Sequence, residues 1–269
     1  MCLIVFAWKY HPDYPLIMAA NRDEYYQRPT VLADFWEDQP NILAGRDLNS
    51  GGTWLGINRQ GRFAAVTNYR EGHQQPAPRS RGELTANFLG SDIDVKQYAQ
   101  HVIDEGDQYN GFNLLLGDGD QLYYCSNRQS QIQQVLPGLY SLSNHLLDSP
   151  WPKTIHAKEA LEPLLKTQVI DREQLIQSLQ RREPFADEYL PDTGVGLAME
   201  RMLSPPFITS KDYGTRCTTM LLKSHGVKND RTEKNPIETM FVEQNYGNDG
   251  VSGERRTFNL VNSSSRANQ

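Results

Sequence analysis

The chain has 269 residues, a formal net charge of −6 at pH 7, and 38% hydrophobic and 22% charged residues. These values are typical of a folded globular protein and exclude a disordered or fibrous chain. The negative net charge argues against a nucleic-acid-binding surface, because such surfaces concentrate Lys and Arg to displace counterions. We therefore expect no nucleic-acid partner.

The cysteines and the apolar runs indicate where the protein works. Cys2, Cys125 and Cys217 are odd in number and widely spaced, which matches neither a disulfide framework nor a zinc site and favours the reducing cytoplasm. The apolar run 2–8 lacks a basic region before it, so we interpret it as a buried strand rather than a signal peptide. No other apolar run is long enough to span a membrane. The six histidines lack zinc-type spacing, so we expect no metal.

The first half of the chain is predicted to form hairpins and two helices. Short apolar runs flank turn residues such as Pro12 and Gly61, and Gly61 suits a positive φ. Asp94 can cap a helix whose apolar residues recur at helical spacing. The expected elements are hairpins of 2–10 with 15–20, 54–58 with 63–69 and 112–116 with 121–125, and helices over 83–89 and 94–103.

The second half is predicted to contain helices followed by strands. Pro152 suits the first turn of a helix. We expect helices over 152–165 and 171–181, a long proline-containing loop over 182–210, strands over 217–222, 239–242 and 256–261, and a charged loop over 223–235.

This order of elements predicts an α+β fold. Strands, then helices, then strands are typical of antiparallel sheets packed face to face with helices on their outer surfaces, a four-layer αββα sandwich. We expect one such domain over 1–261 and a disordered tail over 262–269.

Cys2 is the candidate nucleophile. Removal of Met1 would place an α-amine and a thiol on one residue, and an amine with an ordinary pKa of about 7.7–8.0 can accept the thiol proton. The alternative is that Cys2 is only the start of a buried strand.

Four polar residues follow the second predicted strand, opposite the start of the first. In this position Arg22 would favour the Cys2 thiolate, and Asp23 would orient the ammonium form of the α-amine. Asn21 and Glu24 complete the tetrad and are candidates for substrate binding. The alternative is a solvated turn with a local ion pair.

Several motifs, spread over most of the chain, resemble the NRDE family. They lie at residues 1–5, 21–24, 44–47, 51–56, 143–144, 147–153 and 213–219. The same order of elements is similar, more distantly, to the penicillin V acylase and choloylglycine hydrolase group of N-terminal-nucleophile hydrolases. That resemblance implies that Cys2 is the nucleophile and that Arg22 and Asp23 match a short polar motif, although their spacing differs.

The resemblance also implies roles for two asparagines. Asn68 and Asn144 match residues that hold a carbonyl oxyanion, a task suited to a preorganised amide N–H. Alternatively, Asn68 ends a strand and Asn144 caps the turn before Asp148. Arg216 is a candidate distal positive charge, or else a surface residue at a strand end.

Two functional hypotheses follow. In the first, Cys2 hydrolyses a small acyl amide without a cofactor, with Trp54 as a wall of the pocket or a core residue and His145 beside the site. In the second, the family resemblance implies a non-catalytic protein of haem or lipid/acyl-CoA binding and trafficking, linked to Golgi organisation. Haem would then need an axial ligand such as Cys2, Cys217, His145 or a Tyr. A purely structural role is disfavoured because the tetrad gathers functional groups at one strand end.

Overall fold

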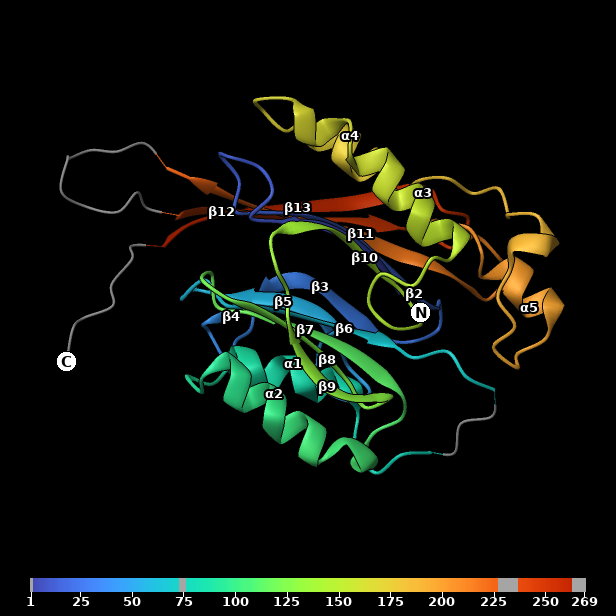
Figure 1. The fold of residues 1–269 in the computed structure, drawn as a ribbon, viewed down its shortest axis with the longest axis horizontal. Coiled ribbons are helices and arrows are strands. Elements are labelled where there is room, and N and C mark those ends of the chain that lie inside the picture. Colours follow the sequence, from blue (N-terminus) through green and yellow to red (C-terminus); the bar gives the residue numbers. More distant parts are fainter. Residues whose placement is uncertain (1, 73–75, 227–236, 263–269) are drawn as a thin grey trace.

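The computed structural model describes residues 2–72, 76–226 and 237–262. Within them, two antiparallel sheets lie face to face between two helical layers (Figure 1). The predicted αββα sandwich is thereby confirmed. None of the described helices is both long and apolar enough to cross a bilayer.

The first sheet joins the two ends of the chain. Its six described strands are, in spatial order, β10 (Gly138–Leu142), β1 (Cys2–Trp8), β2 (Leu16–Tyr25), β11 (Tyr213–His225), β12 (Ile237–Tyr246) and β13 (Ser252–Asn262). β1 pairs with β2 on one side and β10 on the other, so the first strand is internal to the sheet. The tetrad Asn21 to Glu24 lies within β2, which continues beyond the predicted end at residue 20, and it is opposite the start of β1 as predicted.

The second sheet is a meander in which the strands follow chain order. Its seven described strands are β3 (Thr30–Phe35), β4 (Ile42–Asp47), β5 (Leu55–Asn58), β6 (Phe63–Asn68), β7 (Phe112–Gly117), β8 (Leu122–Ser126) and β9 (Gln129–Gln134). Gly61 and Gly119 occupy the tight turns between paired strands with φ of 88° and 100°, a conformation that glycine adopts without strain. The expected hairpins β5–β6 and β7–β8 are confirmed.

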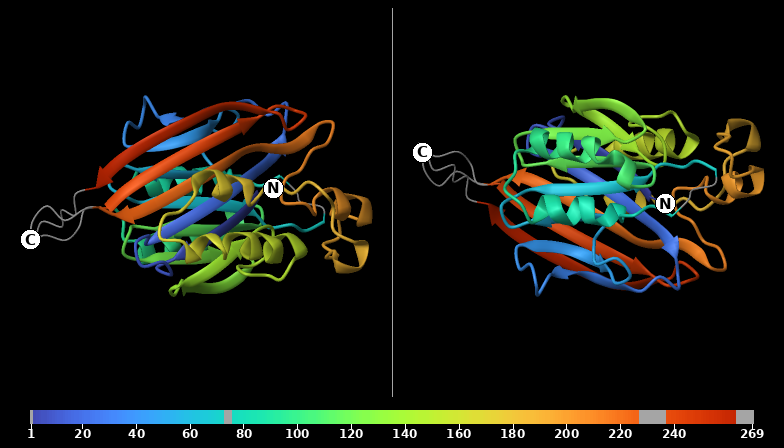
Figure 2. Two further views of the ribbon diagram at one scale, coloured as in Figure 1. Left: turned by 90° about the horizontal axis from the view of Figure 1, so that it is seen from above. Right: turned by 90° about the horizontal axis from the view of Figure 1, so that it is seen from below.

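Helices cover the outer face of each sheet, as the views in Figure 2 also show. α1 (Arg81–Leu89) and α2 (Val95–Asp104) pack on the second sheet, and α3 (Pro152–Leu161) and α4 (Arg172–Gln177) pack on the first. Asp94 caps α2 by accepting from two main-chain N–H groups, as predicted. A short helix α5 (Leu197–Met202) lies at the end of the molecule where β2 also ends (Figure 1).

Some boundaries differ from the predictions. β3, β4, β9, β10 and α5 were not predicted, because these short segments of five or six residues show no clear alternation or helical period. α3 and α4 end earlier than expected, β11 continues to His225, and Asn262 belongs to β13. The rest of the predicted tail, 263–269, and most of the charged loop, 227–235, lie outside the described residues.

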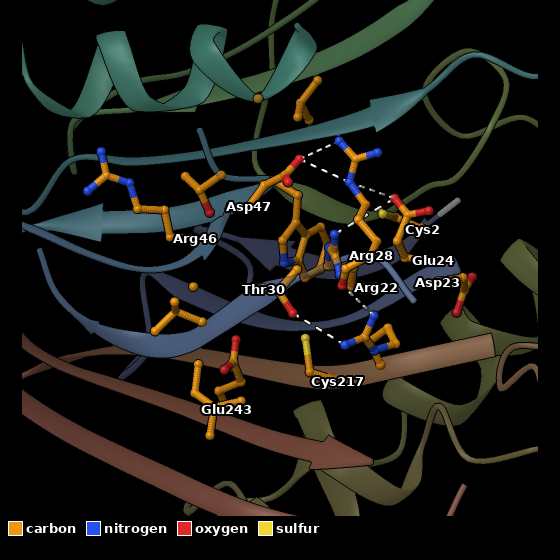
Figure 3. Close-up of a pocket in the computed structure, with 18 of the residues that line it drawn as sticks. Cys2, Arg22, Asp23, Glu24, Arg28, Thr30, Arg46, Asp47, Cys217 and Glu243 are labelled. Carbon is orange, nitrogen blue, oxygen red and sulfur yellow. Dashed lines mark hydrogen bonds and ion pairs between the residues drawn. The ribbon is translucent and has the colours of Figure 1, made fainter. Parts of the chain in front are cut away.

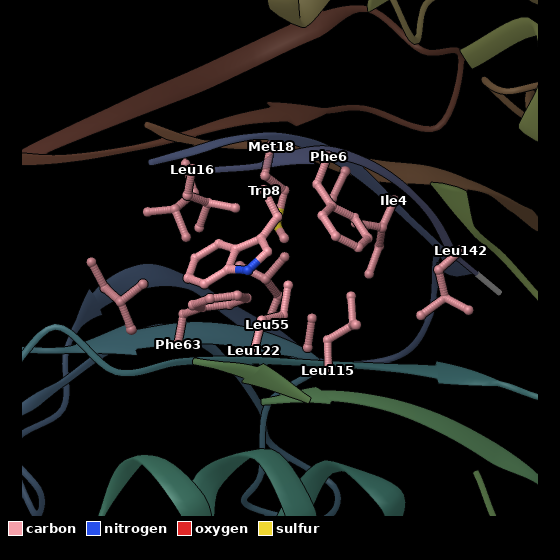
Figure 4. Packing of buried hydrophobic residues seen from close by; sticks show 14 of the residues in the cluster. Ile4, Phe6, Trp8, Leu16, Met18, Leu55, Phe63, Leu115, Leu122 and Leu142 are labelled. Carbon is pink, nitrogen blue, oxygen red and sulfur yellow. The ribbon is translucent and has the colours of Figure 1, made fainter. Parts of the chain in front are cut away.

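The core between the sheets decides where a site can form. Inward-facing residues of both sheets, including Phe6, Trp8, Leu16 and Phe63, are almost fully buried (Figure 4). Burying a large apolar side chain of this kind stabilises the fold by about 1.5–3 kcal/mol. Further along the strands the inward positions become polar, and there the packed core gives way to a cavity.

Candidate active site

A cavity of about 260 Å³ lies between the two sheets where their inward positions become polar. Along β2, the inward positions change from Met18 and Ala20 in the core to Arg22 in the cavity. Along β12, they change in the same way from Phe241 to Glu243. The cavity is close to the lower limit of pockets that take small molecules.

Cys2 opens β1 and faces this cavity. Its Cα is in register with that of Arg22, and its side chain follows the same inward alternation as Ile4. Ser143 Oγ donates to the Cys2 carbonyl at 2.8 Å, which fixes the main chain next to the thiol. Only 7% of Cys2 is exposed, and burial raises the pKa of its thiol, so attack by the thiolate requires a base.

The tetrad is divided by the alternation of β2. Arg22 and Glu24 line the cavity, with 3.8 Å between Arg22 Nη2 and Glu24 Oε2. The Asn21 side chain instead faces the helical layer, where its Nδ2 donates to the carbonyls of Leu179 and Pro206 at 3.0 and 2.9 Å. The structure therefore does not place Asn21 on the cavity wall.

Asp23 borders the cavity and is almost completely buried. Its Oδ1 accepts a 2.7 Å hydrogen bond from Thr215 Oγ1. Burial is the main cause that raises the pKa of Asp23, and the nearby positive charges of Lys153 and Arg70 oppose it. Asp23 thus connects the cavity to buried charges behind it.

A β-bulge presents Arg216 to the cavity. Thr215 pairs with Asp23 and Cys217 with Arg22, so Arg216 is the extra residue between them. Bulges redirect side chains in this way next to functional sites. The Arg216 guanidinium donates to the carbonyls of Tyr25 and Arg28 at 2.8 and 3.2 Å.

The two predicted asparagines have different positions. Asn68 ends β6 and lines the cavity. Asn144 is fully buried behind it and does not line the cavity. Its Oδ1 accepts from Ser143 Oγ at 3.1 Å and from Lys153 Nζ at 3.3 Å.

Of the two remaining candidates, Trp54 lines the cavity and His145 does not. The His145 ring packs on Tyr69 and Trp151, with centroids 5.0 and 5.8 Å away. Its Nδ1 lies 2.7 Å from Ser149 Oγ, and burial lowers the pKa of the ring.

The sequence reasoning missed a group of buried charges behind Asp23. Arg70 and Glu200 form an ion pair with 2.5 Å between Nη1 and Oε2, and both side chains are only 2% exposed. Lys153 opens α3 beside them, and its burial, together with the Arg70 charge, lowers its pKa from the usual 10.5 to about 7. The one available signal was the position of Lys153 inside a family motif.

The sequence reasoning also missed charged residues on the cavity wall (Figure 3). Arg28 donates to Asp47 Oδ2 from Nε and Nη2 at 3.0 and 2.5 Å. On the opposite wall Glu243 accepts from the Ala33 main-chain N–H at 2.8 Å, and burial raises the pKa of its carboxyl.

Two glycines bring the start of α1 to the cavity. Gly52 and Gly82 pack main chain against main chain, and Thr53 N–H donates to the Gly82 carbonyl at 3.1 Å. A Cβ on Gly52 would overlap the Gly82 main chain. This close approach places Ser80 and Arg81 on the cavity wall.

No three His, Cys, Asp or Glu side chains gather into a metal-binding group among the described residues. The cavity instead combines the thiols of Cys2 and Cys217 with several guanidinium groups, and a thiol beside positive charges is suited to act as a nucleophile.

The solved structures that resemble this chain include two proteins that are each 9% identical to it in sequence. One is a mutant conjugated bile acid hydrolase from Clostridium perfringens, with a TM-score of 0.48 and 100% of both chains covered. The other is a Caenorhabditis elegans orthologue of N-acylethanolamine-hydrolysing acid amidase, with a TM-score of 0.43 and coverage of 66% of this chain and 85% of that one.

Comparison with known sequences gives much closer relatives. The family model described as Transport and Golgi organisation 2 matches residues 1–238. The human Transport and Golgi organization protein 2 homolog is 40% identical over 243 residues, covering 82% of this chain and 88% of the relative. The Drosophila melanogaster protein is 27% identical over 271 residues, covering 88% and 94%. The chain therefore belongs to the Transport and Golgi organisation 2 family, the NRDE family that its motifs resemble.

Proposed function

We propose that the protein hydrolyses a small acyl amide, with Cys2 as its N-terminal nucleophile after removal of Met1, a residue outside the described part of the chain. The observation that carries this proposal is the inward position of Cys2 at the start of β1, on the wall of a cavity that also contains Arg22 and Asn68.

In the proposed reaction, the freed α-amine of Cys2 takes the thiol proton, because burial disfavours spontaneous ionisation of the thiol. The thiolate attacks the amide carbonyl to form a C–S bond, and Asn68 stabilises the oxyanion. The ammonium then gives its proton to the leaving amine as the C–N bond breaks, while Asp23 supports the ammonium charge. Water, activated by the same amine, hydrolyses the thioester and restores the thiol.

The remaining proposed site residues have supporting roles. Arg22, in register with Cys2, favours the thiolate, and Arg216 supplies a more distant positive charge on the cavity wall. Glu24 and Trp54 line the cavity as substrate contacts. Asn21, Asn144 and His145 lie behind the wall, so we assign them to positioning neighbouring groups.

Incubation of the full chain with a library of N-acyl amides, followed by mass spectrometry of the released amines and acids, tests the reaction. We expect turnover only when intact mass shows Cys2 at the N-terminus, and no turnover for Cys2→Ala. Cys125→Ala is the matched control, because Cys125 is buried in the core beneath α1 and α2. Turnover that persists in Cys2→Ala would contradict the mechanism.

The alternative proposal, haem or lipid/acyl-CoA binding without reaction, has weaker support from the donor set. Cys2 and Cys217 line the cavity, but burial raises the pKa of both thiols and so disfavours a thiolate ligand. His145 does not line the cavity. A haem titration separates the two proposals, because a saturable, stoichiometric Soret shift is expected only if haem binds specifically.

The cytoplasm is the proposed location. Cys2, Cys125 and Cys217 are all free and buried, which is compatible with a reducing compartment. Cys2 and Cys217 lie on opposite sides of Arg22, two inter-strand spacings or about 10 Å apart, too far for a disulfide without movement of the main chain.

A further inference from the structure

The positive charges of the cavity are not all balanced by nearby carboxylates. Asp47 is bound by Arg28, and Glu24 is shared between Arg22 and Arg28 at 3.8 Å from each. Glu243 is held by main-chain and amide donors, and burial favours its neutral form. Asp23 accepts from Thr215 Oγ1, and burial raises the pKa of its carboxyl. The ion pairs of Glu24 and Asp47 involve Arg22 and Arg28, and within the described residues they do not include Arg81 or Arg216.

Arg81 is the clearest case. It is the first residue of α1, lines the cavity with Cys2, and has no ion pair with any residue that the structure describes. Its one hydrogen bond runs from Nη1 to the Gly111 carbonyl at 3.0 Å, so its other donors have no partner within the same part of the chain. Arg79, only two residues earlier, contrasts with it by pairing with both Glu83 and Glu105.

Arg216 is also without an ion pair among the described residues, but it differs from Arg81 in its hydrogen bonds. Its guanidinium is held by two carbonyls and by Thr30 Oγ1, so most of its donors are used. Arg81 keeps a free edge of its guanidinium, and a planar edge of this kind matches the two oxygens of a carboxylate.

The surroundings of Arg81 favour an anion close to the nucleophile. Arg81 lines the same cavity as Cys2 and Glu24. Burial is the main cause that lowers the pKa of its guanidinium, and negative charge at Cys2 and Glu24 opposes this effect. Removing a charged guanidinium from water costs free energy unless a counterion balances its charge. A ligand carboxylate would supply that counterion within the same small cavity.

We propose that Arg81 binds a carboxylate of the substrate, so that the protein selects small amides that carry a carboxylate on one side of the scissile bond. This inference rests on the proposed function for the reaction, but the binding preference can be measured without any turnover. Arg81 is thus a specificity-determining residue on the wall next to Cys2.

The test measures binding by calorimetry to the full chain carrying Cys2→Ala. Two matched pairs of probes differ only in charge: N-butyrylglycine with N-butyrylglycinamide, and N-ethylsuccinamate with N-ethylsuccinamide. The first pair places the carboxylate on the leaving amine and the second places it on the acyl group. We expect the acid of at least one pair to bind roughly ten- to a hundredfold more tightly than its amide. A hydrogen bond between charged groups contributes an affinity difference of this size.

Additional substitutions identify the residue responsible. Arg81→Gln is expected to remove the preference, Arg81→Lys to keep part of it, and Arg172→Gln, on the exposed start of α4, to leave it unchanged. Thermal unfolding checks each variant, and Arg81→Lys provides the comparison if Arg81→Gln does not fold. Equal binding of acid and amide in both pairs, or a preference that survives loss of Arg81, overturns the inference. A preference without hydrolysis by the Cys2 protein refutes only the proposed reaction.

Discussion

The side chain of Asn144 holds the main chain of Asn68, because its Nδ2 donates to the Asn68 carbonyl at 3.0 Å. Asn68 lines the cavity, whereas Asn144 is completely buried and also accepts from Lys153 at 3.3 Å. The wall of the cavity is therefore tied to the buried charges by one amide group.

Replacing Asn144 by Ala should destabilise the protein. The substitution leaves the Asn68 carbonyl and the Lys153 amine with fewer partners in the interior, which costs about 1–3 kcal/mol for each buried group left unsatisfied. Urea denaturation measures the free energy of unfolding, and Asn49→Ala, at an exposed turn, should change it by less than about 0.5 kcal/mol. Equal effects of the two substitutions would show that the Asn144 hydrogen bonds contribute nothing.

The pKa of Lys153 predicts a specific pH dependence of stability. Its pKa is lowered to about 7 in the folded protein from the usual 10.5, so between these values the unfolded chain binds more protons. The free energy of unfolding should therefore rise with pH across this window, by at most about 1.4 kcal/mol per pH unit from this group. Below pH 7 the full penalty of charging the buried amine is present.

Lys153→Met removes this titration and nearly preserves side-chain length. The difference in unfolding free energy between wild type and Lys153→Met, measured by denaturation from pH 6.5 to 10, should shift in favour of wild type as the pH rises. Using the difference cancels the contributions of titrating groups that do not interact with Lys153. A difference that stays constant with pH would mean that Lys153 keeps an ordinary pKa.

The buried pair of Arg70 and Glu200 should be sensitive to loss of one partner. Glu200→Leu removes the carboxylate that pairs with the buried Arg70 guanidinium, and breaking a buried ion pair typically costs about 3–5 kcal/mol. The matched control on the same helix is Arg201 with Asp187, whose side chains are 50% and 45% exposed. Asp187→Leu should cost less than about 1 kcal/mol, since solvent screens exposed pairs. Similar losses measured by urea denaturation for both substitutions would contradict this distinction.

The contact between Gly52 and Gly82 predicts that a single methyl group disturbs the cavity. Gly52→Ala would force the start of α1 away from β5, at a cost of about 1–3 kcal/mol for overpacking. Because Arg81 moves with the helix, KM should rise more than kcat falls. Gly253→Ala serves as the control, since a Cβ there meets its nearest atom at 3.5 Å. Unchanged kinetics and stability in Gly52→Ala would show that the main chain adapts without moving Arg81.

The sequence predicted those parts of the fold that depend on local pattern. The continuous apolar run of residues 2–8, the turn at Gly61 and the cap at Asp94 each determine a nearby structure, and all three elements are present. β3 and β4 were missed because few of their residues are fully buried and the apolar period is weak.

It was harder to predict from the sequence which residues line the cavity and which of them contact one another. Period-two alternation within a longer β2 would have separated Asn21 from Arg22, but the predicted strand ended at residue 20 and the four polar residues were treated as one group. The bulge at Arg216 depends on a register between strands far apart in the chain, and no local pattern specifies it. Arg70 and Glu200 are adjacent only in three dimensions, so their pairing leaves no signal in one sequence.

The pairing of β1 with β2, next to β11 and β12, has a consequence for biosynthesis. During translation Cys2 leaves the ribosome first, whereas Arg216, Cys217 and Glu243 on the facing walls leave it last. Domains whose contacts join distant segments complete their structure only when the last segment is available. The nascent chain thus carries its thiol without the enclosing pocket until β11 and β12 have been synthesised.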